Sequence, residues 1–152
     1  MNQVNELDFV HLHVHSEFSL VDGIIRVKEL VNNSADRGFH SVALTDLTNL
    51  FGLLEFYRTA RERGIKPIVG SEINIAKDKD SIAAPLVLIA MNKQGYINLT
   101  KLVSKAYVEG QVKGEPIVFF KWLEEFSDGL IALSGGLEAV SYTHLTLPTN
   151  LS

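Results

Sequence analysis

Short apolar runs that alternate with helical patterns are the feature that most constrains the fold of this chain. Five runs have the length and composition of β-strands: residues 8–15, 41–45, 65–75, 85–92 and 129–135. Apolar residues spaced three and four apart predict four helices: residues 26–37, 50–63, 94–109 and 121–126. Strands that alternate with helices indicate βαβ units. The sequence therefore predicts an α/β fold built on a parallel sheet or barrel.

Individual positions predict how these helices end and which side chains share a face. Gly38 and Gly64 are placed to end the first two helices, because glycine readily adopts the backbone conformation found after a helix. One face of the second helix carries Leu50, Leu54, Tyr57 and Arg61. The inner side of the third helix carries Tyr96, Leu99, Val103, Ala106 and Tyr107. Residues 77–84 predict a polar surface turn, and residues 110–116, which contain Gly and Pro, predict a loop.

The composition excludes several classes of protein. The 152 residues contain no cysteine, which rules out disulfides, thiolate metal sites and cysteine nucleophiles and fits a cytoplasmic protein. The formal net charge of −4 argues against binding of nucleic acid by bulk electrostatics. No apolar stretch approaches the ~18 residues of a membrane span, and we expect no signal peptide after Met1.

The last residues break the α/β pattern. Residues 141–152 (SYTHLTLPTNLS) contain no Asp, Glu, Lys or Arg and show no period, although another helix or strand is due after Gly136. We interpret residues 1–140 as a partial domain that is cut off near Val140. Residues 141–152 would then be a non-native or disordered tail, which resembles a translated cloning adapter. The alternative is a genuine polar C-terminal tail.

The most informative chemical feature is the segment HLHVHS at residues 11–16. A strand repeats its side-chain direction every two residues, so His11, His13 and His15 would share one face at spacings of roughly 7 Å. Imidazoles at this separation can chelate one metal ion or bridge two, and imidazole suits Zn, Mn, Fe and Ni. The alternative is a strand whose polar positions face solvent. We favour a metal-related site, because three of the five histidines fall in this segment.

Three acidic residues are candidates to join the histidines. Asp22 could supply a carboxylate ligand on the loop after the histidine segment, or form a common Asp-Gly turn. Glu72 lies inside an apolar run, where either a metal ion or a salt bridge with Lys or Arg would compensate its charge. Asp46 ends the second strand, where βα barrels gather their chemistry. For Asp46 we favour the alternative, a cap on the following helix.

Four segments resemble one known family, in the same order along the chain. They are FVHLHVHSEFSLVDG (9–23), ALTDLTNLFGLLEFYRTARERGIKPIVGSEINI (43–75), GYINLTKLVSKAYVEG (95–110) and GLIALSGG (129–136). Together they resemble the PHP (polymerase and histidinol phosphatase) domain at the N-terminus of bacterial replicative DNA polymerase III alpha subunits. The resemblance covers roughly residues 5–140. It implies an α/β fold of the PHP type, a distorted (β/α)7 barrel that is incomplete in this chain.

The resemblance also implies a metal site and shows where this chain departs from it. The family holds up to three metal ions, and its ligands are matched by His13, His15, Asp22 and Glu72, with His11 and Asp46 as supporting residues. Ligand positions are lost at Leu47, where the family motif Thr-Asp-His-Gly has its histidine, and at Pro85 and Gly136. The last Asp and His ligands lie beyond residue 140. We therefore expect a degenerate site, with no catalytic residue in this chain.

The functional expectations follow from the resemblance. The parent protein would be a DNA-directed DNA polymerase that uses Mg²⁺, primer–template DNA and dNTPs through domains absent here. The PHP domain would act as a scaffold that docks the proofreading exonuclease subunit beside other replicase subunits, with residual Zn or Mn. The main alternative is an active metal-dependent phosphoesterase or 3′–5′ exonuclease. A third candidate is a stand-alone small binding domain.

Overall fold

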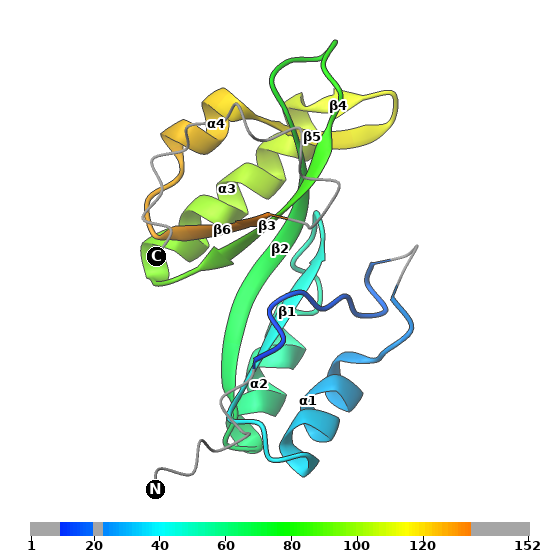
Figure 1. The fold of residues 1–152 in the computed structure, drawn as a ribbon, viewed down its shortest axis with the longest axis vertical. Coiled ribbons are helices and arrows are strands. Elements are labelled where there is room, and N and C mark those ends of the chain that lie inside the picture. The colour runs from blue at the N-terminus through cyan, green and yellow to red at the C-terminus, as the bar shows by residue number, and fades with distance from the viewer. Residues whose placement is uncertain (1–9, 20–22, 135–152) are drawn as a thin grey trace, which may run out of the picture. The chain divides into compact units, whose positions relative to one another are not determined.

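The computed structural model describes residues 10–19 and 23–134, and the chain divides into two compact units after Val69 (Figure 1). The first unit comprises residues 1–69 and the second comprises residues 70–152. Helices and strands occur in both units, so the predicted α/β class is confirmed. The predicted tail at residues 141–152 lies outside the described residues.

The first unit contains two helices and a strand around one core. Helix α1 (Val27–Asp36) contacts helix α2 (Leu53–Glu62) and strand β1 (Ser41–Leu47). Strand β1 pairs with β2 (Lys66–Ala76), which begins in this unit and continues into the next. The core consists of buried apolar side chains from α1, β1 and α2, together with Ile65 just before β2: Val27, Leu30, Val31, Val42, Leu44, Phe56, Ala60 and Ile65.

Both helices of the first unit end at the predicted glycines. Gly38 has φ 81° and Gly64 has φ 68°, a left-handed backbone that residues with a Cβ rarely adopt. After Gly38, the Phe39 amide donates to the Ser34 carbonyl at 3.0 Å. Such a bond satisfies a carbonyl of the last helical turn. The predicted ends of these helices are therefore confirmed.

The predicted face of α2 that carries Leu54 and Tyr57 is not the face that packs into the core. Leu54 is 61% exposed and Tyr57 is 47% exposed, although their spacing indicated an apolar face. Phe56 and Ala60 are fully buried instead, and both belong to the core of the unit. This segment contains two rows of residues with helical spacing, one through Leu54 and one through Phe56, and either row could face the core. The phenylalanine removes a large apolar surface from water with no polar group to satisfy, so the Phe56 stripe faces the core.

The strand predicted at residues 8–15 is wrong for the part that the structure describes, because residues 10–15 are not assigned to a strand. The Val14 carbonyl does accept from the Thr45 amide at 2.8 Å, as in a ladder. The Val14 amide, however, donates to Thr45 Oγ1 at 2.8 Å. A side chain thus takes the place of a second backbone partner at this point of β1, and the regular ladder is interrupted.

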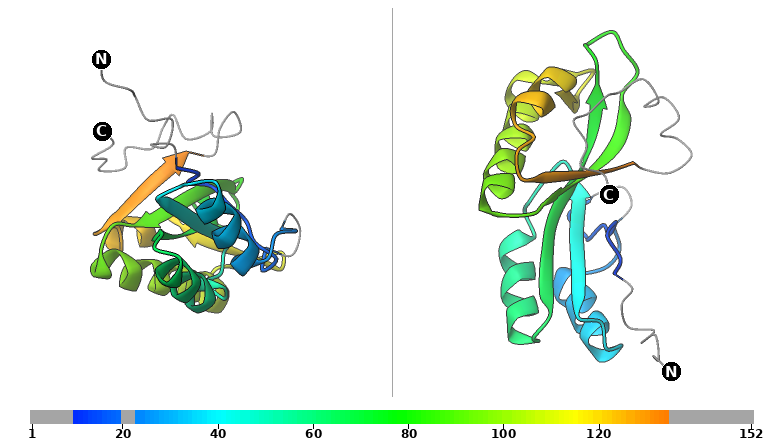
Figure 2. Two further views of the ribbon diagram at one scale, coloured as in Figure 1. Left: turned by 90° about the horizontal axis from the view of Figure 1, so that it is seen from below. Right: turned by 60° about the vertical axis from the view of Figure 1, so that its left-hand side comes forward.

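The second unit is a sheet covered by two helices. Its strands lie in the open order β4-β5-β2-β3-β6, with bounds β3 (Ala84–Ala90), β4 (Gln111–Val112), β5 (Glu115–Phe119) and β6 (Leu130–Ser134). Helix α3 (Lys93–Glu109) contacts β3, β5 and β6, and helix α4 (Phe120–Glu125) contacts β5 (Figure 2). The largest fully buried side chains of this unit come from both layers: Ile73, Ile75, Leu88, Leu99 and Leu102.

The sheet of the second unit is mixed, which corrects the prediction of a parallel sheet. Strand β3 runs antiparallel to both β2 and β6, whereas β2 and β5 are parallel. The connection between β2 and β3 consists of residues 77–83 alone. A connection this short cannot contain the helical crossover that parallel neighbours need. The polar turn predicted at residues 77–84 therefore closes a hairpin.

A short hairpin replaces most of the loop predicted at residues 110–116. Strands β4 and β5 pair antiparallel. Lys113 and Gly114 form the turn, with φ 52° and 83°. Two successive positive φ values are typical of a type I′ turn, which matches the twist of the strands it joins. The two residues of β4 are too few for alternation to reveal a strand.

The predicted inner side of α3 is confirmed at its centre and wrong at its ends. Leu99, Val103 and Ala106 are buried. Tyr96 and Tyr107 are 41% and 44% exposed. Tyrosine keeps a polar hydroxyl, so a partly exposed position near a helix end suits it better than the core does.

Trp122, the one tryptophan of the chain, anchors α4. Its side chain is buried, with the Phe119 ring packed edge-on at a centroid distance of 4.7 Å. The Lys105 ammonium of α3 lies 4.9 Å from the centre of the indole ring. This cation–π contact and the aromatic pair join α4 to α3 and β5.

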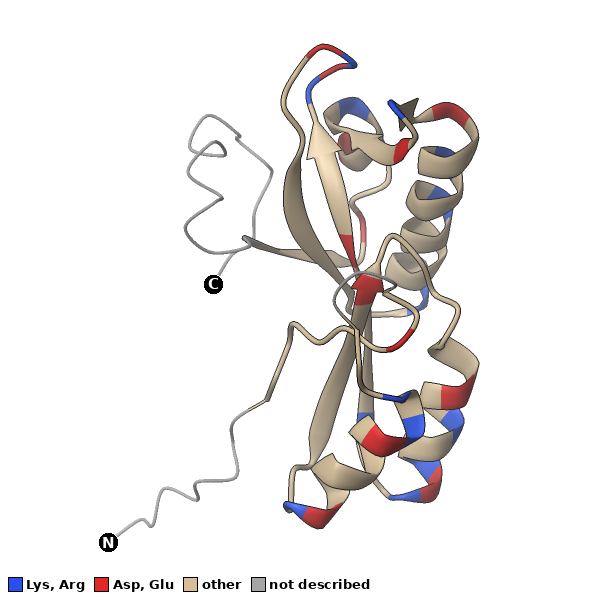
Figure 3. Cartoon of the chain, turned by 90° about the vertical axis from the view of Figure 1, so that its right-hand side faces the viewer, with Lys and Arg blue, Asp and Glu red and all other residues tan. Residues whose placement is uncertain are grey.

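Charges of both signs occur on the helices (Figure 3). Each of the four helices in the described residues carries at least one acidic and one basic side chain. Lys28 of α1 lies 3.5 Å from Glu55 of α2, and Arg63 lies 2.7 Å from Asp36. None of the described helices has the length and apolar character needed to cross a membrane.

A close approach between α3 and Gly129, the residue directly before β6, leaves no room for a side chain at Gly95. Asn92 caps α3 by accepting from the Gly95 amide at 2.9 Å, and the Met91 amide donates to the Gly129 carbonyl at 2.8 Å. A Cβ on Gly95 would lie 1.9 Å from that carbonyl oxygen. Backbone must therefore move before any side chain fits at this position.

We predict that Gly95→Ala lowers the free energy of unfolding by about 2–3 kcal/mol, the usual cost of overpacking. Gly114→Ala is the matched control, because a Cβ there meets no atom within 4 Å and only the left-handed backbone opposes it. That control should cost about 1 kcal/mol. Urea unfolding of the chain measures both values. Equal losses for the two variants would contradict the close approach.

Candidate metal centre

The structure brings two of the three predicted histidines together. The rings of His13 and His15 are 5.0 Å apart between centroids, at an interplanar angle of 83°. His13 is exposed and His15 is partly buried. The His11 ring instead packs edge-on against Phe39 at 5.9 Å. The ligand atoms of His13 and His15 lie within 4.8 Å of each other, whereas the His11 ring packs beside Phe39.

Strand β1 fixes the backbone that carries this histidine pair. Val14, between the two histidines, exchanges hydrogen bonds with Thr45 through both its amide and its carbonyl. Ser16, directly after His15, donates from its amide to Asp46 Oδ1 at 2.6 Å. The residues on either side of His15 are thus tied to consecutive residues of β1.

Asp46 is the centre of a buried hydrogen-bond network. Its carboxylate accepts from the Ser16 amide, from Ser16 Oγ at 2.7 Å and from Ser19 Oγ at 2.8 Å. All three residues are buried, with exposed fractions of 2% or less. The capping role that we favoured for Asp46 is wrong, because α2 begins only at Leu53 and has no side-chain cap. The turn that contains Asn49 separates Asp46 from the helix.

Ser16 and Ser19 are functional candidates that sequence reasoning missed. Serines are common in turns, so their identity alone carries little information. The signal available in the sequence was the position of Ser16, which directly follows the histidine segment. The structure adds that the hydroxyls of both serines donate to a buried acid. A buried carboxylate needs donors of this kind nearby, since charges are rarely buried without partners.

Leu47 is the last residue of β1, and Thr48 begins the turn that follows it. The Leu47 amide donates to Ser19 Oγ at 2.9 Å, and the leucine side chain carries no atom able to bind a metal. Thr48 has φ 45°, which is a genuine outlier for a β-branched residue. Its side chain is 2% exposed, and Thr48 Oγ1 has no hydrogen-bond partner among the described residues. In the family motif Thr-Asp-His-Gly, a glycine would stand at this position.

Glu72 and Pro85 belong to the second unit. Glu72 is 8% exposed on β2, where it pairs with Val87 of β3. Pro85 lies near the start of β3 opposite Asn74 and is partly buried. The pyrrolidine ring of Pro85 offers no donor atom to a metal. Whether Glu72 serves a metal or a salt bridge stays a prediction.

The remaining predicted site positions lie outside the described residues. These are Asp22, in the gap at residues 20–22, and Gly136, which follows the last described residue. The assignment of Asp22 as a ligand and of Gly136 as a lost ligand position therefore stay predictions.

The donor set decides which metal centre fits. Two imidazoles suit one ion such as Zn²⁺ or Mn²⁺. A hydrolytic cluster of two or three ions needs most of its ligands and their supporting contacts in place. Leu47 and Pro85 supply no ligand atom. Whether the site holds one ion or a cluster stays a prediction.

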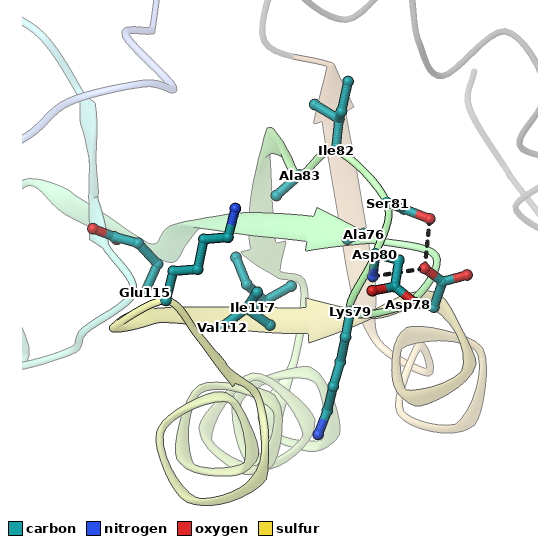
Figure 4. Close-up of a pocket in the computed structure, with 11 residues that line it drawn as sticks. Ala76, Asp78, Lys79, Asp80, Ser81, Ile82, Ala83, Val112, Glu115 and Ile117 are labelled. Carbon is teal, nitrogen blue, oxygen red and sulfur yellow. Dashed lines mark hydrogen bonds between the residues drawn. The ribbon is translucent and has the colours of Figure 1, made fainter.

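A cavity of about 450 Å³ lies elsewhere, in the second unit (Figure 4). Its lining comes from the loop between β2 and β3 and from the β4–β5 hairpin: Ala76, Asp78, Lys79, Asp80, Ser81, Ile82, Ala83, Val112, Lys113, Glu115 and Ile117. None of the predicted site residues lines it. The cavity is open to solvent, and Ile82, which lines it, is 92% exposed. We assign it no catalytic role.

The chain matches known proteins over most of its length. The model of the family described as PHP domain matches residues 11–148. DNA polymerase III subunit alpha of Pseudomonas aeruginosa is 48% identical over 133 residues, and that of Vibrio cholerae serotype O1 is 47% identical over 130 residues. These alignments cover 87% and 84% of this chain but 11% of each relative. The chain therefore spans about one ninth of the length of these curated relatives.

A solved structure is also similar. It is an amidohydrolase from Chromobacterium violaceum, 25% identical in sequence, with a TM-score of 0.49. The alignment covers 63% of this chain and 34% of that one.

We predict that Thr48→Gly raises the free energy of unfolding by about 1 kcal/mol. Glycine removes the left-handed strain, worth about 1–2 kcal/mol, and the unpaired buried hydroxyl; the larger backbone entropy of glycine offsets about 0.5–1 kcal/mol of this gain. Thr48→Ala is the control, because it removes the hydroxyl but keeps a Cβ on a left-handed backbone, and it should gain less. Chemical unfolding measures both. A loss of stability in Thr48→Gly would contradict strain at this turn.

We predict that Ser81→Ala raises the pKa of Asp78. The Ser81 hydroxyl and then the Asp80 amide lower this pKa from its ordinary value of 3.8, by hydrogen bonds of 2.8 and 3.0 Å to Asp78 Oδ1. Because the folded-state pKa is lowered, the contacts stabilise the loop above pH 3.8 and lose their effect as the pH falls through the lowered value. Carboxyl-detected NMR titration measures the shift. An unchanged pKa in the variant would show that the Ser81 contact does not form.

Proposed function

We propose that this chain, which belongs to the PHP domain family, is part of a replicative DNA polymerase III alpha subunit whose PHP domain no longer hydrolyses phosphoesters. The identities of 47–48% to DNA polymerase III alpha subunits support the assignment to that parent protein. The partial PHP domain would comprise residues 1–140, with residues 141–152 outside it. Polymerase activity, with its Mg²⁺, primer–template DNA and dNTPs, would reside in parts of the polypeptide beyond this chain.

The single observation that carries the loss of hydrolysis is Leu47. It stands where the family motif has a histidine ligand, and its backbone is integrated into the fold through Ser19. Pro85 adds a second position without a donor atom. An open hydrolytic geometry cannot be held with these ligands missing, because the remaining donors leave the ions under-coordinated.

One residual ion is consistent with the remaining donors. His13 and His15 would hold it, with Glu72 and Asp22 as further ligands carried over from the family and with His11 and Asp46 as supporting residues. Each of the two histidines offers one ring nitrogen to such an ion. A bound Zn²⁺ or Mn²⁺ supplies Lewis acidity. In this chain its main effect would be to stabilise the histidine segment, since binding of a metal to the folded state adds to stability.

A domain that has lost its chemistry but keeps its fold is suited to a structural role. We place the PHP domain as a platform of the replicase that docks the proofreading exonuclease subunit, in the cytoplasm with the other replicase subunits. The mixed charge of the helices fits binding of a protein better than binding of phosphates, since no described helix presents basic residues alone.

A second candidate function is an active metal-dependent phosphoesterase or 3′–5′ exonuclease. The close pair of His13 and His15 rings favours it, since two imidazoles at 5.0 Å are poised to share an ion. Leu47 and Pro85 oppose it. Metal stoichiometry and hydrolysis distinguish the two functions.

We predict that the purified chain binds no more than about one Zn²⁺ or Mn²⁺ and does not hydrolyse p-nitrophenyl phosphate above background. Elemental analysis after dialysis measures the metal, and a colorimetric assay measures hydrolysis. His13→Ala with His15→Ala should abolish the bound metal. His40→Ala is the matched control, because His40 is an exposed histidine outside the pair.

The same replacements in the full-length alpha subunit test the function that we propose for the parent protein. Primer extension should survive replacement of His13 and His15, apart from any loss of stability. Two or three ions per chain, with hydrolysis that a chelator abolishes and that depends on His13 and His15, would overturn the degenerate site in favour of the phosphoesterase.

A further inference from the structure

We propose that Asp46 is a positioning residue that, together with Thr45, fixes the backbone on both sides of His15 and so presents the His13–His15 pair before any ion arrives. The inference deepens the proposed residual metal site and rests on it for the identity of the ligand. The positioning itself concerns side chains of the first unit only, and it is measurable without a metal.

The backbone contacts bracket His15 closely. On its N-terminal side, the Val14 carbonyl accepts from the Thr45 amide and the Val14 amide donates to Thr45 Oγ1, both at 2.8 Å. On its C-terminal side, the Ser16 amide donates to Asp46 Oδ1 at 2.6 Å. His15 therefore has little freedom to rotate about its own backbone while the Thr45–Asp46 dipeptide is in place.

The carboxylate also closes the turn that follows the histidines. Ser19 Oγ donates to Asp46 Oδ1 and accepts from the Leu47 amide at 2.9 Å, while the Ser19 amide donates to the Ser16 carbonyl at 2.9 Å. The turn from Ser16 to Ser19 is thus bonded both to itself and to β1. The turn cannot move away from β1 unless several of these bonds break together.

Burial strengthens the hydrogen bonds that the Asp46 carboxylate accepts. Asp46 is 1% exposed, and its three bonds from Ser16 and Ser19 have the short distances of charge-assisted hydrogen bonds. If the carboxylate is removed, the buried Ser16 amide and two buried hydroxyls lose their acceptor. Water can satisfy them only if the turn opens, and opening the turn releases His15.

Preorganisation of the His13–His15 pair raises its affinity for a metal ion. If two imidazoles are already held near each other, binding of an ion does not have to order them, and this entropy cost is absent from the binding free energy. Loss of a residue that orients a metal ligand typically lowers metal affinity about 10–100-fold. Asp46 would then matter to the ion through the geometry of His15, without contacting it.

The first experiment is NMR on the labelled chain in the presence of a chelator. In Asp46→Ala, the His15 amide and ring signals should move to random-coil positions, whereas signals of α1 and α2 stay in place. Asp46→Asn should retain most of the native His15 shifts, because its amide oxygen still accepts from Ser16 and its NH₂ group can donate to Ser16 Oγ. Val31→Ala is the control for stability alone, since Val31 lies in the core outside the network, and it should leave the His15 signals unchanged.

The second experiment is a Co²⁺ titration followed by visible absorption. Asp46→Ala should lower the Co²⁺ affinity about 10–100-fold relative to the unmodified chain, with Asp46→Asn in between and Val31→Ala without effect. Native His15 shifts in Asp46→Ala would overturn the positioning role, whatever the titration gives. Ordered His15 signals that Asp46→Ala disrupts, in a chain that binds no Co²⁺, would support the positioning role and overturn the residual metal site instead.

Discussion

The first unit depends on a buried negative charge. Asp46 lies at 1% exposure, where an uncompensated carboxylate would be prohibitive, and the fold meets this constraint with donors from Ser16 and Ser19. This requirement shapes the N-terminal segment more than strand propensity does. The turn after the histidines must come back to β1 to supply its hydroxyls, so the preceding residues lie along β1 without forming a regular strand.

The same constraint separates the support of the histidines from the ligands of a metal. The contacts of Thr45 and Asp46 are made by this chain's own backbone and hydroxyl groups, so they persist whether or not an ion is bound. The side chains of Leu47 and Pro85, in contrast, carry no atom that can bind a metal ion. A site of this type can lose its hydrolytic chemistry while the scaffold around it stays intact.

Much of the fold could be predicted from local patterns. Gly38 and Gly64 have the conformation that their positions implied, and the four helices and strands β1, β2, β3 and β6 appear within a few residues of their predicted bounds. Strands β4 and β5 were not predicted. What failed were choices that depend on tertiary structure. Spacing could not decide whether Leu54 or Phe56 faces the core, and the direction of β3 depended on the length of one connection.

Part of the candidate site, like part of the fold, could be predicted from the sequence. The two-residue spacing of the histidines predicted that His13 and His15 share a face. Their rings do lie close together, although the expected strand did not form. The Asp46 network required knowledge of which hydroxyls are buried, which no local pattern provides. The left-handed backbone of Thr48 was also invisible, since a β-branched residue is the last one expected there.

The location of the one tryptophan has a practical consequence. Trp122 is buried in the second unit, between Phe119 and the Lys105 ammonium, and the first unit contains no indole. Intrinsic fluorescence excited at the red edge therefore reports on one half of the molecule and is blind to the half that carries the histidines. Agreement or disagreement between that emission and far-UV circular dichroism would reveal whether the two halves melt in concert.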